Sequence, residues 1–169
     1  MNPSATPNPH PKFLAPGQGP AMPGPAGVQM VLKLTASETN DVISITEYHC
    51  PPGDGPPLHR HTREDETFYV IEGAVTFHIG EPGAAQIIDA PAGSTVFGAR
   101  GTPHTFKNRG TTTAKLLLIV TPPANFETFY ARMMGPAEGG GAPSPAEIQR
   151  RVVVYGAEHG IEIMGPNPL

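Results

Sequence analysis

The sequence predicts an all-β domain, built as a closed or double-sheet antiparallel barrel and followed by two short helices. Between residues 29 and 121, short runs rich in Val, Ile, Leu, Thr and Phe alternate with Gly, Pro, Asn and Asp, the usual punctuation of strands and turns. Helical patterning occurs only after residue 124. Closure of one sheet, or pairing of two, removes the exposed edges that so many short strands would otherwise leave.

A flexible arm is expected to precede the barrel. Residues 1–27 hold eight prolines and four glycines, and this composition offers little apolar surface to offset the entropy lost on ordering. We expect the arm to be disordered or to lie extended on a partner subunit. The barrel is expected over residues 28–135, and residues 136–169 are expected to form a linker, a short helix and a tail.

The barrel is expected to contain nine strands, because nine short runs have strand composition and each is closed by turn residues. In chain order they are Gln29–Leu34, Val42–His49, Leu58–His61, Glu66–Ile71, Ala74–Ile79, Gln86–Ala90, Ser94–Phe97, His104–Asn108 and Ala114–Thr121. The short connections between them favour antiparallel neighbours.

Two helices are expected near the end of the chain. Asn125 can cap a first helix with one apolar face, which would end at Gly135. Ser144 is a suitable N-cap for a second helix that has Pro145 in its first turn, and Gly156 is its expected end.

Charge and composition exclude several classes of partner. The formal net charge is -4 and there is no block of basic residues, so neither nucleic acid nor an anionic membrane is an expected partner. Cys50 is the only cysteine, which rules out a disulfide within the chain and a cysteine-based zinc site. Neither a secretory signal nor a membrane-spanning run is visible, and we therefore expect a cytoplasmic protein.

Four side chains are candidate metal ligands. His59 and His61 are two residues apart, and on an extended strand such residues point to the same face, which would place their imidazoles side by side. Glu66, at the start of the next expected strand, could add an oxygen ligand. His104 opens a later strand after a Gly-Thr-Pro turn. Because neutral imidazole is a common metal ligand, a barrel that brought these side chains together would hold one metal ion.

A simpler explanation of the His-x-His pair is pairing on the surface of an exposed strand. The remaining four histidines are not expected to be ligands, because they lie in or near the tails, at a strand end or between apolar neighbours. They are His10, His49, His78 and His159.

Two spaced motifs favour the metal site over surface pairing. The first, Gly-x5-His-x-His-x4-Glu-x6-Gly, is formed by Gly53, His59, His61, Glu66 and Gly73. The second, Gly-x5-Ala-x-Gly-x2-His-x3-Asn, is formed by Gly93, Ala99, Gly101, His104 and Asn108. In both motifs the chain resembles the cupin superfamily, over about residues 28–135. Ala99 stands where that family usually has Pro, a departure that concerns the rigidity of a turn rather than the ligand set.

The resemblance implies a double-stranded β-helix, which is a conical jelly-roll-like barrel, with one divalent metal ion held by His59, His61, Glu66 and His104. The ion could be Fe, Mn, Ni, Co, Cu or Zn, because this ligand set accepts most first-row metals. Within the superfamily, residues 55–73 and 100–108 are most similar to small monocupins of the quercetin dioxygenase type.

The expected function is that of a metal-dependent dioxygenase acting on a flavonol-like or other enolisable aromatic small molecule. Glu66 would be the catalytic base that takes the proton of the enol. Apolar residues that alternate with polar ones along the strands are expected to line the substrate pocket, namely Ile43, Ile45, Phe68, Phe77, Phe97, Phe106 and Leu118.

Two other functions stay open at this point. The first is a metal-dependent isomerase or cyclase of polyketide-like compounds, which would need no dioxygen. The second is a non-catalytic module that binds or senses a small molecule. In all three cases we expect a homodimer, because cupins commonly pair through sheet edges.

Overall fold

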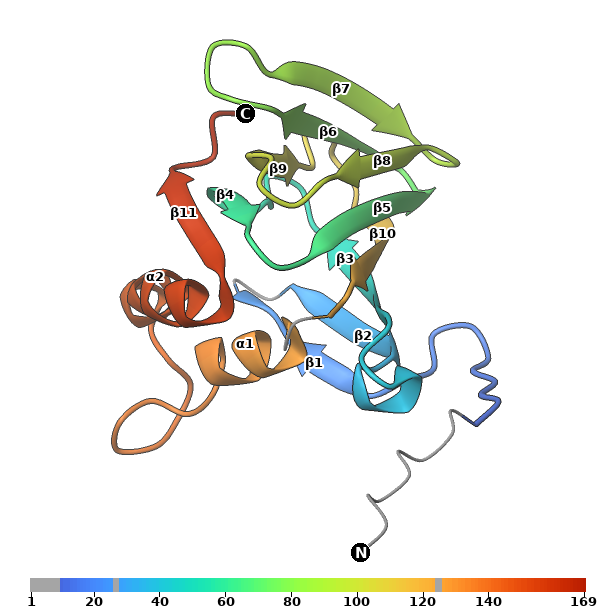
Figure 1. Cartoon of the computed structure of the whole chain (residues 1–169), viewed down its shortest axis with the longest axis vertical. Coiled ribbons are helices and arrows are strands. Elements are labelled where there is room, and N and C mark those ends of the chain that lie inside the picture. The colour runs from blue at the N-terminus through green and yellow to red at the C-terminus, as the bar shows by residue number, and fades with distance from the viewer. Residues whose placement is uncertain (1–9, 26–27, 124–125) are drawn as a thin grey trace, which may run out of the picture.

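The computed structural model describes residues 10–25, 28–123 and 126–169. Its strands form two antiparallel sheets that pack against each other over a shared hydrophobic core (Figure 1). Two helices lie beside these sheets, and the second helix contacts the last strand of the smaller sheet. The predicted all-β fold with two C-terminal helices is therefore confirmed.

The larger sheet has six strands in the order β1-β2-β3-β10-β5-β8. These strands are β1 (Ala21–Pro23), β2 (Gln29–Leu34), β3 (Ser44–Cys50), β5 (Asp65–Glu72), β8 (Thr95–Gly98) and β10 (Ala114–Thr121). A short 3-10 helix, η2 (Ser37–Thr39), joins β2 to β3. Along β10 every second residue is buried, which is the alternation of a strand with one face on the core.

The smaller sheet has five strands in the order β11-β4-β9-β6-β7. These strands are β4 (Leu58–His61), β6 (Ala74–Ile79), β7 (Gln86–Pro91), β9 (His104–Lys107) and β11 (Ile161–Gly165). The ring centroids of Phe68 on β5 and Phe77 on β6 lie 5.1 Å apart, and this contact joins the two sheets at the centre of the core. Burial of such aromatic rings contributes a large share of the apolar area removed from water.

All nine strands predicted from the sequence are present. Four have the predicted bounds, and the others differ by one or two residues at an end. The largest difference is at β3, which begins at Ser44 rather than Val42. Asn40 and Asp41 both have positive φ, at 53° and 58°, so the turn before β3 extends further along the chain than its composition indicates.

The helices are α1 (Phe126–Met133) and α2 (Pro145–His159). The predicted cap of α1, Asn125, lies outside the described residues. Ser144 caps α2 as predicted, because its side chain accepts a hydrogen bond from the Glu147 amide. The predicted end of α2 at Gly156 is wrong.

Helix α2 continues through Gly156 and ends at Gly160, which has a φ of 81°. Gly156 lies inside the helix, at the point where Ile161 of the following strand packs against it. A Cβ atom built on this residue would lie 3.0 Å from the main-chain oxygen of Ile161. The glycine is therefore required by packing against the next strand and does not terminate the helix.

Two strands lie in segments for which no strand was predicted. β1 pairs with β2, so residues 21–23 of the expected flexible arm belong to the larger sheet. β11 pairs with β4, with Ile161 opposite His61 and Ile163 opposite His59. The C-terminal segment therefore directly supports the strand that carries two candidate ligands. Within the described residues, no helix has both the length and the apolar character needed to cross a membrane.

Candidate metal centre

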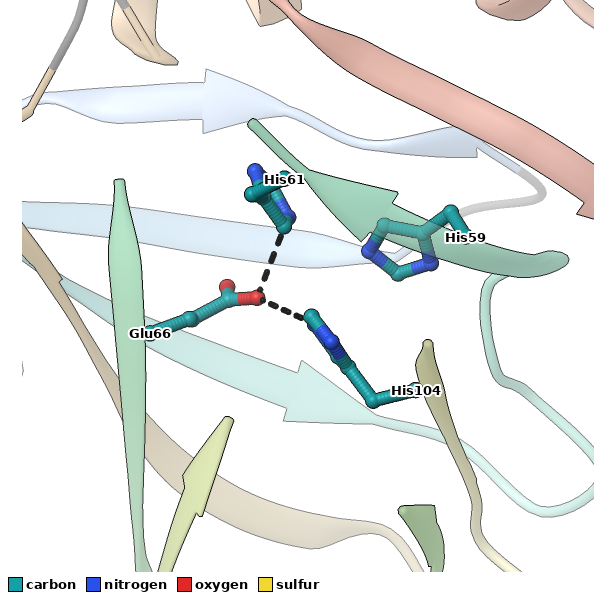
Figure 2. A group of neighbouring side chains, drawn as sticks. All are labelled: His59, His61, Glu66 and His104. Atoms are coloured by element: carbon teal, nitrogen blue, oxygen red, sulfur yellow. Dashed lines mark hydrogen bonds and ion pairs between the residues drawn. The ribbon is translucent and has the colours of Figure 1, made fainter. Parts of the chain in front are cut away.

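The two sheets bring all four candidate ligands together. His59 and His61 lie on β4, and His104 is the first residue of β9, directly opposite His59 in the register. Glu66 comes from β5 in the facing sheet. One ligand atom from each of the four residues lies within 4.8 Å of the others, and all four side chains are buried. Figure 2 shows Glu66 reaching across to His61 and His104.

The imidazole rings are held by hydrogen bonds at the nitrogen that faces away from Glu66. His59 Nδ1 donates to the main-chain oxygen of Pro57 at 2.8 Å, and His104 Nδ1 donates to that of Thr102 at 2.9 Å. His61 Nδ1 donates instead to the Glu64 carboxylate at 2.7 Å. With the proton on Nδ1, the Nε2 atom of each ring is the lone-pair donor that a metal ion requires.

The donor set fits a divalent first-row metal ion. Glu66 Oε2 lies 3.1 Å from His104 Nε2 and 3.3 Å from His61 Nε2. His61 Nε2 is buried without a hydrogen bond of good geometry, and such an orphaned atom is one that a bound cation would satisfy. Three imidazole nitrogens and one carboxylate oxygen leave one or two coordination positions open on a five- or six-coordinate ion. These four residues could therefore hold a metal that still binds a substrate.

Burial and mutual contact shift the pKa values of the ligands in opposite directions. Burial and the nearby His104 and His61 lower the pKa of His59 to about 3. Burial also disfavours the charged form of His61, but the Glu64 hydrogen bond and the Glu66 carboxylate outweigh it and raise its pKa to about 9. Burial would raise the pKa of Glu66, yet its contacts with His104 and His61 lower it well below the usual range. The His61 imidazole and the Glu66 carboxylate therefore favour each other's charged forms.

The turn before His104 carries the Ala99 departure from the cupin pattern, and hydrogen bonds hold it. The Thr102 amide donates to the Ala99 oxygen at 2.9 Å, and the Gly101 amide donates to the His61 oxygen at 2.7 Å. Arg100 forms an ion pair with Asp65 at 2.7 Å. These contacts fix the turn that positions His104, so the ring of a proline is not needed there.

A cavity of about 580 Å³ opens onto the metal centre. His59, His61 and Glu66 form part of its wall. The rest is mostly apolar, and none of the described residues that line it is Arg or Lys. Much of this wall comes from the helices and β11, through Phe126, Phe129, Tyr130, Met133, Ile148, Val152, Ile161 and Ile163.

Only two of the seven predicted pocket residues, Phe106 and Leu118, line this cavity. Phe68 and Phe77 are buried in the core beside it. The other three, Ile43, Ile45 and Phe97, are not among the residues that line the cavity. Ile45 is only partly buried because Ser44 and Thr46 take the inward positions of β3, and Ile43 precedes that strand. Phe97 is 57% exposed because Gly98, its neighbour on β8, packs against the His104 ring.

Sequence reasoning also missed polar residues of the site. Glu64 is 1% exposed and contacts a ligand, yet it lies among other charged residues in the turn after His61, with no periodic signal. Asp54 and Tyr48 line the cavity, although Asp54 stands between two glycines in a segment that has only turn character. Tyr130 also lines the cavity, where burial and the negative charges of Glu66 and Asp54 raise its pKa.

The chain is similar to proteins of a known family. Residues 46–120 match the family described as Cupin domain. Among curated proteins, an oxalate-binding protein from Thermotoga maritima is 30% identical over 70 residues, which are 41% of this chain and 54% of that protein. The chain thus spans about half the length of this relative.

Solved structures share the fold. A predicted oxalate decarboxylase from Thermotoga maritima has a TM-score of 0.51 and 25% identity, over 56% of this chain and 79% of that one. The polyketide cyclase RemF from Streptomyces resistomycificus has a TM-score of 0.56 and 21% identity, over 67% and 80%. KdgF from Halomonas has a TM-score of 0.58 and 14% identity, over 67% and 94%. The family match over residues 46–120, together with both motifs and the two-sheet barrel, supports a small protein of the cupin superfamily.

Proposed function

We propose that this cupin is a metal-dependent enzyme that acts on an apolar, enolisable aromatic small molecule, and that it does so as a dioxygenase. The observation that carries the proposal is the opening of the His59, His61, Glu66 and His104 group onto a large cavity with apolar walls. A flat aromatic compound can bury its faces against such walls while one oxygen reaches the metal.

The cavity also argues against oxalate as the substrate, although an oxalate-binding protein is among the relatives. Oxalate is a small dianion, and beyond the charge of the metal itself its carboxylates in a buried site call for cationic side chains. No Arg or Lys is found among the described residues that line the cavity, and its volume of about 580 Å³ is far larger than oxalate needs.

The chain's own residues would divide the chemistry as follows. His59, His61, Glu66 and His104 would hold the metal, and when bound it supplies Lewis acidity that lowers the pKa of an enol or phenol hydroxyl on the substrate. Glu66 is the carboxylate placed to accept the hydroxyl proton, because it lies in the cavity wall within the candidate ligand group. The apolar walls exclude bulk water from the resulting electron-rich anion. Dioxygen is the co-substrate that oxidises this anion, and both of its atoms enter the product.

The test is oxygen consumption by metal-reconstituted protein. Elemental analysis of protein purified without added metal identifies the resident ion first. Protein loaded in turn with iron, manganese, nickel, cobalt or copper is then mixed with flavonols and other enolisable aromatics in an oxygen electrode. The proposal requires one oxygen molecule consumed per substrate lost with at least one metal. If dioxygen is consumed with none of them, the dioxygenase function is rejected.

A second candidate is an isomerase or cyclase of polyketide-like compounds, and Tyr130 favours it. Tyr130 lines the same cavity as Glu66, so a hydroxyl donor and a carboxylate face one substrate. This reaction proceeds without dioxygen. Substrate loss under strictly anaerobic conditions, with a product of unchanged mass, would therefore support it.

The non-catalytic alternative is separated by the Glu66→Gln variant. A sensing module should bind its ligand in both proteins and turn over in neither. An enzyme that uses Glu66 as its base should lose rate by at least about a hundredfold in the variant.

A further inference from the structure

A second polar group faces the same cavity. The hydroxyl of Tyr48 on β3 donates a hydrogen bond to Asp54 Oδ2 at 2.7 Å, and the Cys50 thiol lies 3.5 Å from the same oxygen. Both Tyr48 and Asp54 line the cavity. Burial raises the pKa of Asp54, whereas its contacts with Tyr48 and Cys50 oppose that rise. The metal chemistry proposed above makes no use of this group.

The loop that carries Asp54 is held rigidly against the barrel. The main-chain amide of Asn108 donates to the main-chain oxygen of Asp54 at 2.9 Å, and the main-chain amide of Gly53 donates to the main-chain oxygen of Asn108 at 2.8 Å. The side chain of Asn108 is buried and donates to the main-chain oxygens of Cys50 and Thr112, both at 2.8 Å. The Asp54 carboxylate therefore occupies a defined position at the cavity wall rather than moving with a mobile loop.

This position is separate from the metal centre. Within the described residues, Asp54 forms no hydrogen bond or ion pair with any of the four candidate ligands. Phe106 and Tyr130 line the cavity as well, and the ring of Phe106 lies 5.5 Å from that of Tyr48. A ligand in the cavity would thus meet two polar positions connected by aromatic wall.

The Asp54 carboxylate has capacity for a further hydrogen bond from such a ligand. The hydrogen bonds from Tyr48 and Cys50 both reach Oδ2, and the Gly55 backbone amide is the one other donor to this carboxyl group among the described residues. When a ligand displaces water from a carboxylate oxygen at an apolar cavity wall and offers no hydrogen-bond donor in exchange, binding loses free energy. The Asp54 carboxylate therefore favours ligands that bring a hydroxyl group to it and disfavours those that bring an apolar edge.

We propose that Asp54, oriented by Tyr48, selects substrates that carry a hydroxyl group remote from the oxygen that binds the metal. The inference rests on the proposed function and deepens it, because it narrows the substrate class to aromatic compounds with a second, phenolic hydroxyl. Asp54 accepts the hydrogen bond of that phenol. Tyr48 is a positioning residue that holds the carboxylate through Oδ2.

The experiment compares two flavonols that share the same metal-binding end. 3-Hydroxyflavone has only the 3-hydroxyl beside the 4-carbonyl, whereas quercetin has the same pair and further phenolic hydroxyls. Their dissociation constants are measured by absorbance titration, under anaerobic conditions, with zinc-loaded protein and with the zinc-loaded Asp54→Ala variant. Metal content and circular dichroism of the variant establish that it is folded and loaded.

Wild-type protein is expected to bind quercetin at least about tenfold more tightly, which is the usual size of a hydrogen bond to a charged group. The Asp54→Ala variant should lose this preference while its affinity for 3-hydroxyflavone changes less than about twofold. Equal weakening of both ligands, or no preference in the wild type, overturns the role of Asp54 and leaves the proposed function standing. Failure of both flavonols to bind the wild type overturns the flavonol-like substrate class itself.

Asp54→Asn provides a second measurement should the alanine variant fail to fold. The amide keeps the volume of the side chain and removes its charge, so the preference for quercetin should fall to about twofold or less. An unchanged preference in this variant contradicts the proposal.

Discussion

His61 donates its Nδ1 hydrogen to Glu64 Oε1 at 2.7 Å, and both side chains are almost fully buried. The other two histidines of the centre donate to main-chain oxygens. One imidazole therefore has an anionic partner behind it, which makes its Nε2 the strongest electron donor among the three rings.

Above pH 9, where a proton on His61 no longer competes with the metal, the Glu64→Gln variant should bind metal about 10- to 100-fold more weakly than the wild type. The amide can still accept the Nδ1 hydrogen, so the ring keeps its orientation while the negative charge is lost. Competition with a chelator of known affinity measures the change. Glu162→Gln is the control. Glu162 forms a solvent-exposed ion pair with Arg60, so its substitution should leave metal affinity unchanged. Equal affinity of Glu64→Gln and wild type would contradict this role.

Metal binding should weaken as the pH falls. The pKa of His61 is about 9 in the metal-free protein, and a metal can bind only the neutral ring, so below pH 9 the proton competes with the metal. His59, with a pKa of about 3, is already neutral and should not contribute. Between pH 8 and pH 7 the apparent affinity should drop about tenfold. Titration calorimetry in buffers of different ionisation enthalpy should find about one proton released per metal at pH 7, and no release would refute the expectation.

Removing the metal should lower the thermal stability of the protein. A ligand present at 100 times its dissociation constant stabilises the folded state by about 2.7 kcal/mol, and a chelator abolishes this contribution. Differential scanning calorimetry with and without chelator gives the size of the effect. In His104→Ala the difference should vanish, whereas the exposed His10→Ala should retain it. A chelator effect that persists in His104→Ala would mean that the metal binds elsewhere.

The stability of the helical part of the cavity wall should depend on Arg151. Its buried guanidinium donates to the main-chain oxygens of Met133, Gly135 and Pro136, where α1 ends. Loss of this donor leaves carbonyl groups without partners, so Arg151→Ala should lower the free energy of unfolding by about 3 kcal/mol. Urea denaturation measures the loss. The neighbouring Arg150 is exposed, and Arg150→Ala should change stability by no more than about 0.5 kcal/mol. Similar losses in the two variants would argue against a specific role.

The His59 and His61 half of the candidate ligand group could be predicted from the sequence because its geometry is local. Two residues that are two apart on a strand share a face, and this alone places His59 beside His61. The arrival of Glu66 and His104 depends on the pairing of distant strands. That pairing followed from the motif resemblance and not from the strand pattern itself.

The cavity wall was predicted poorly because inward-facing positions were inferred from hydrophobicity. On β3 the inward residues include Ser44 and Thr46, and the more apolar Ile45 lies on the other face. On β8 the small Gly98 faces inward because the His104 ring needs the space, which leaves Phe97 outside. Alternation shows which residues share a face, but it does not show which face meets the core when polar residues line a functional cavity.

The last strand and the true end of α2 were missed for a tertiary reason. β11 is short and mixed in composition, and it exists as a strand because it pairs with β4. Gly156 has the composition of a helix stop, whereas its role is set by the close approach of Ile161. The strand depends on pairing with a segment far away in the sequence, and the glycine contacts a segment that turns back along the helix. Local propensity carries no information about such contacts.

The family match ends at residue 120, yet helices α1 and α2 and strand β11, which form much of the cavity wall, all lie beyond it. Exchange of a residue such as Val152 or Met133 would change the shape of the cavity without altering any of the four candidate ligands. Relatives that agree with this chain over the shared domain can therefore accept quite different molecules. Which molecule each of them accepts depends on the C-terminal 50 or so residues, because these form much of the cavity wall.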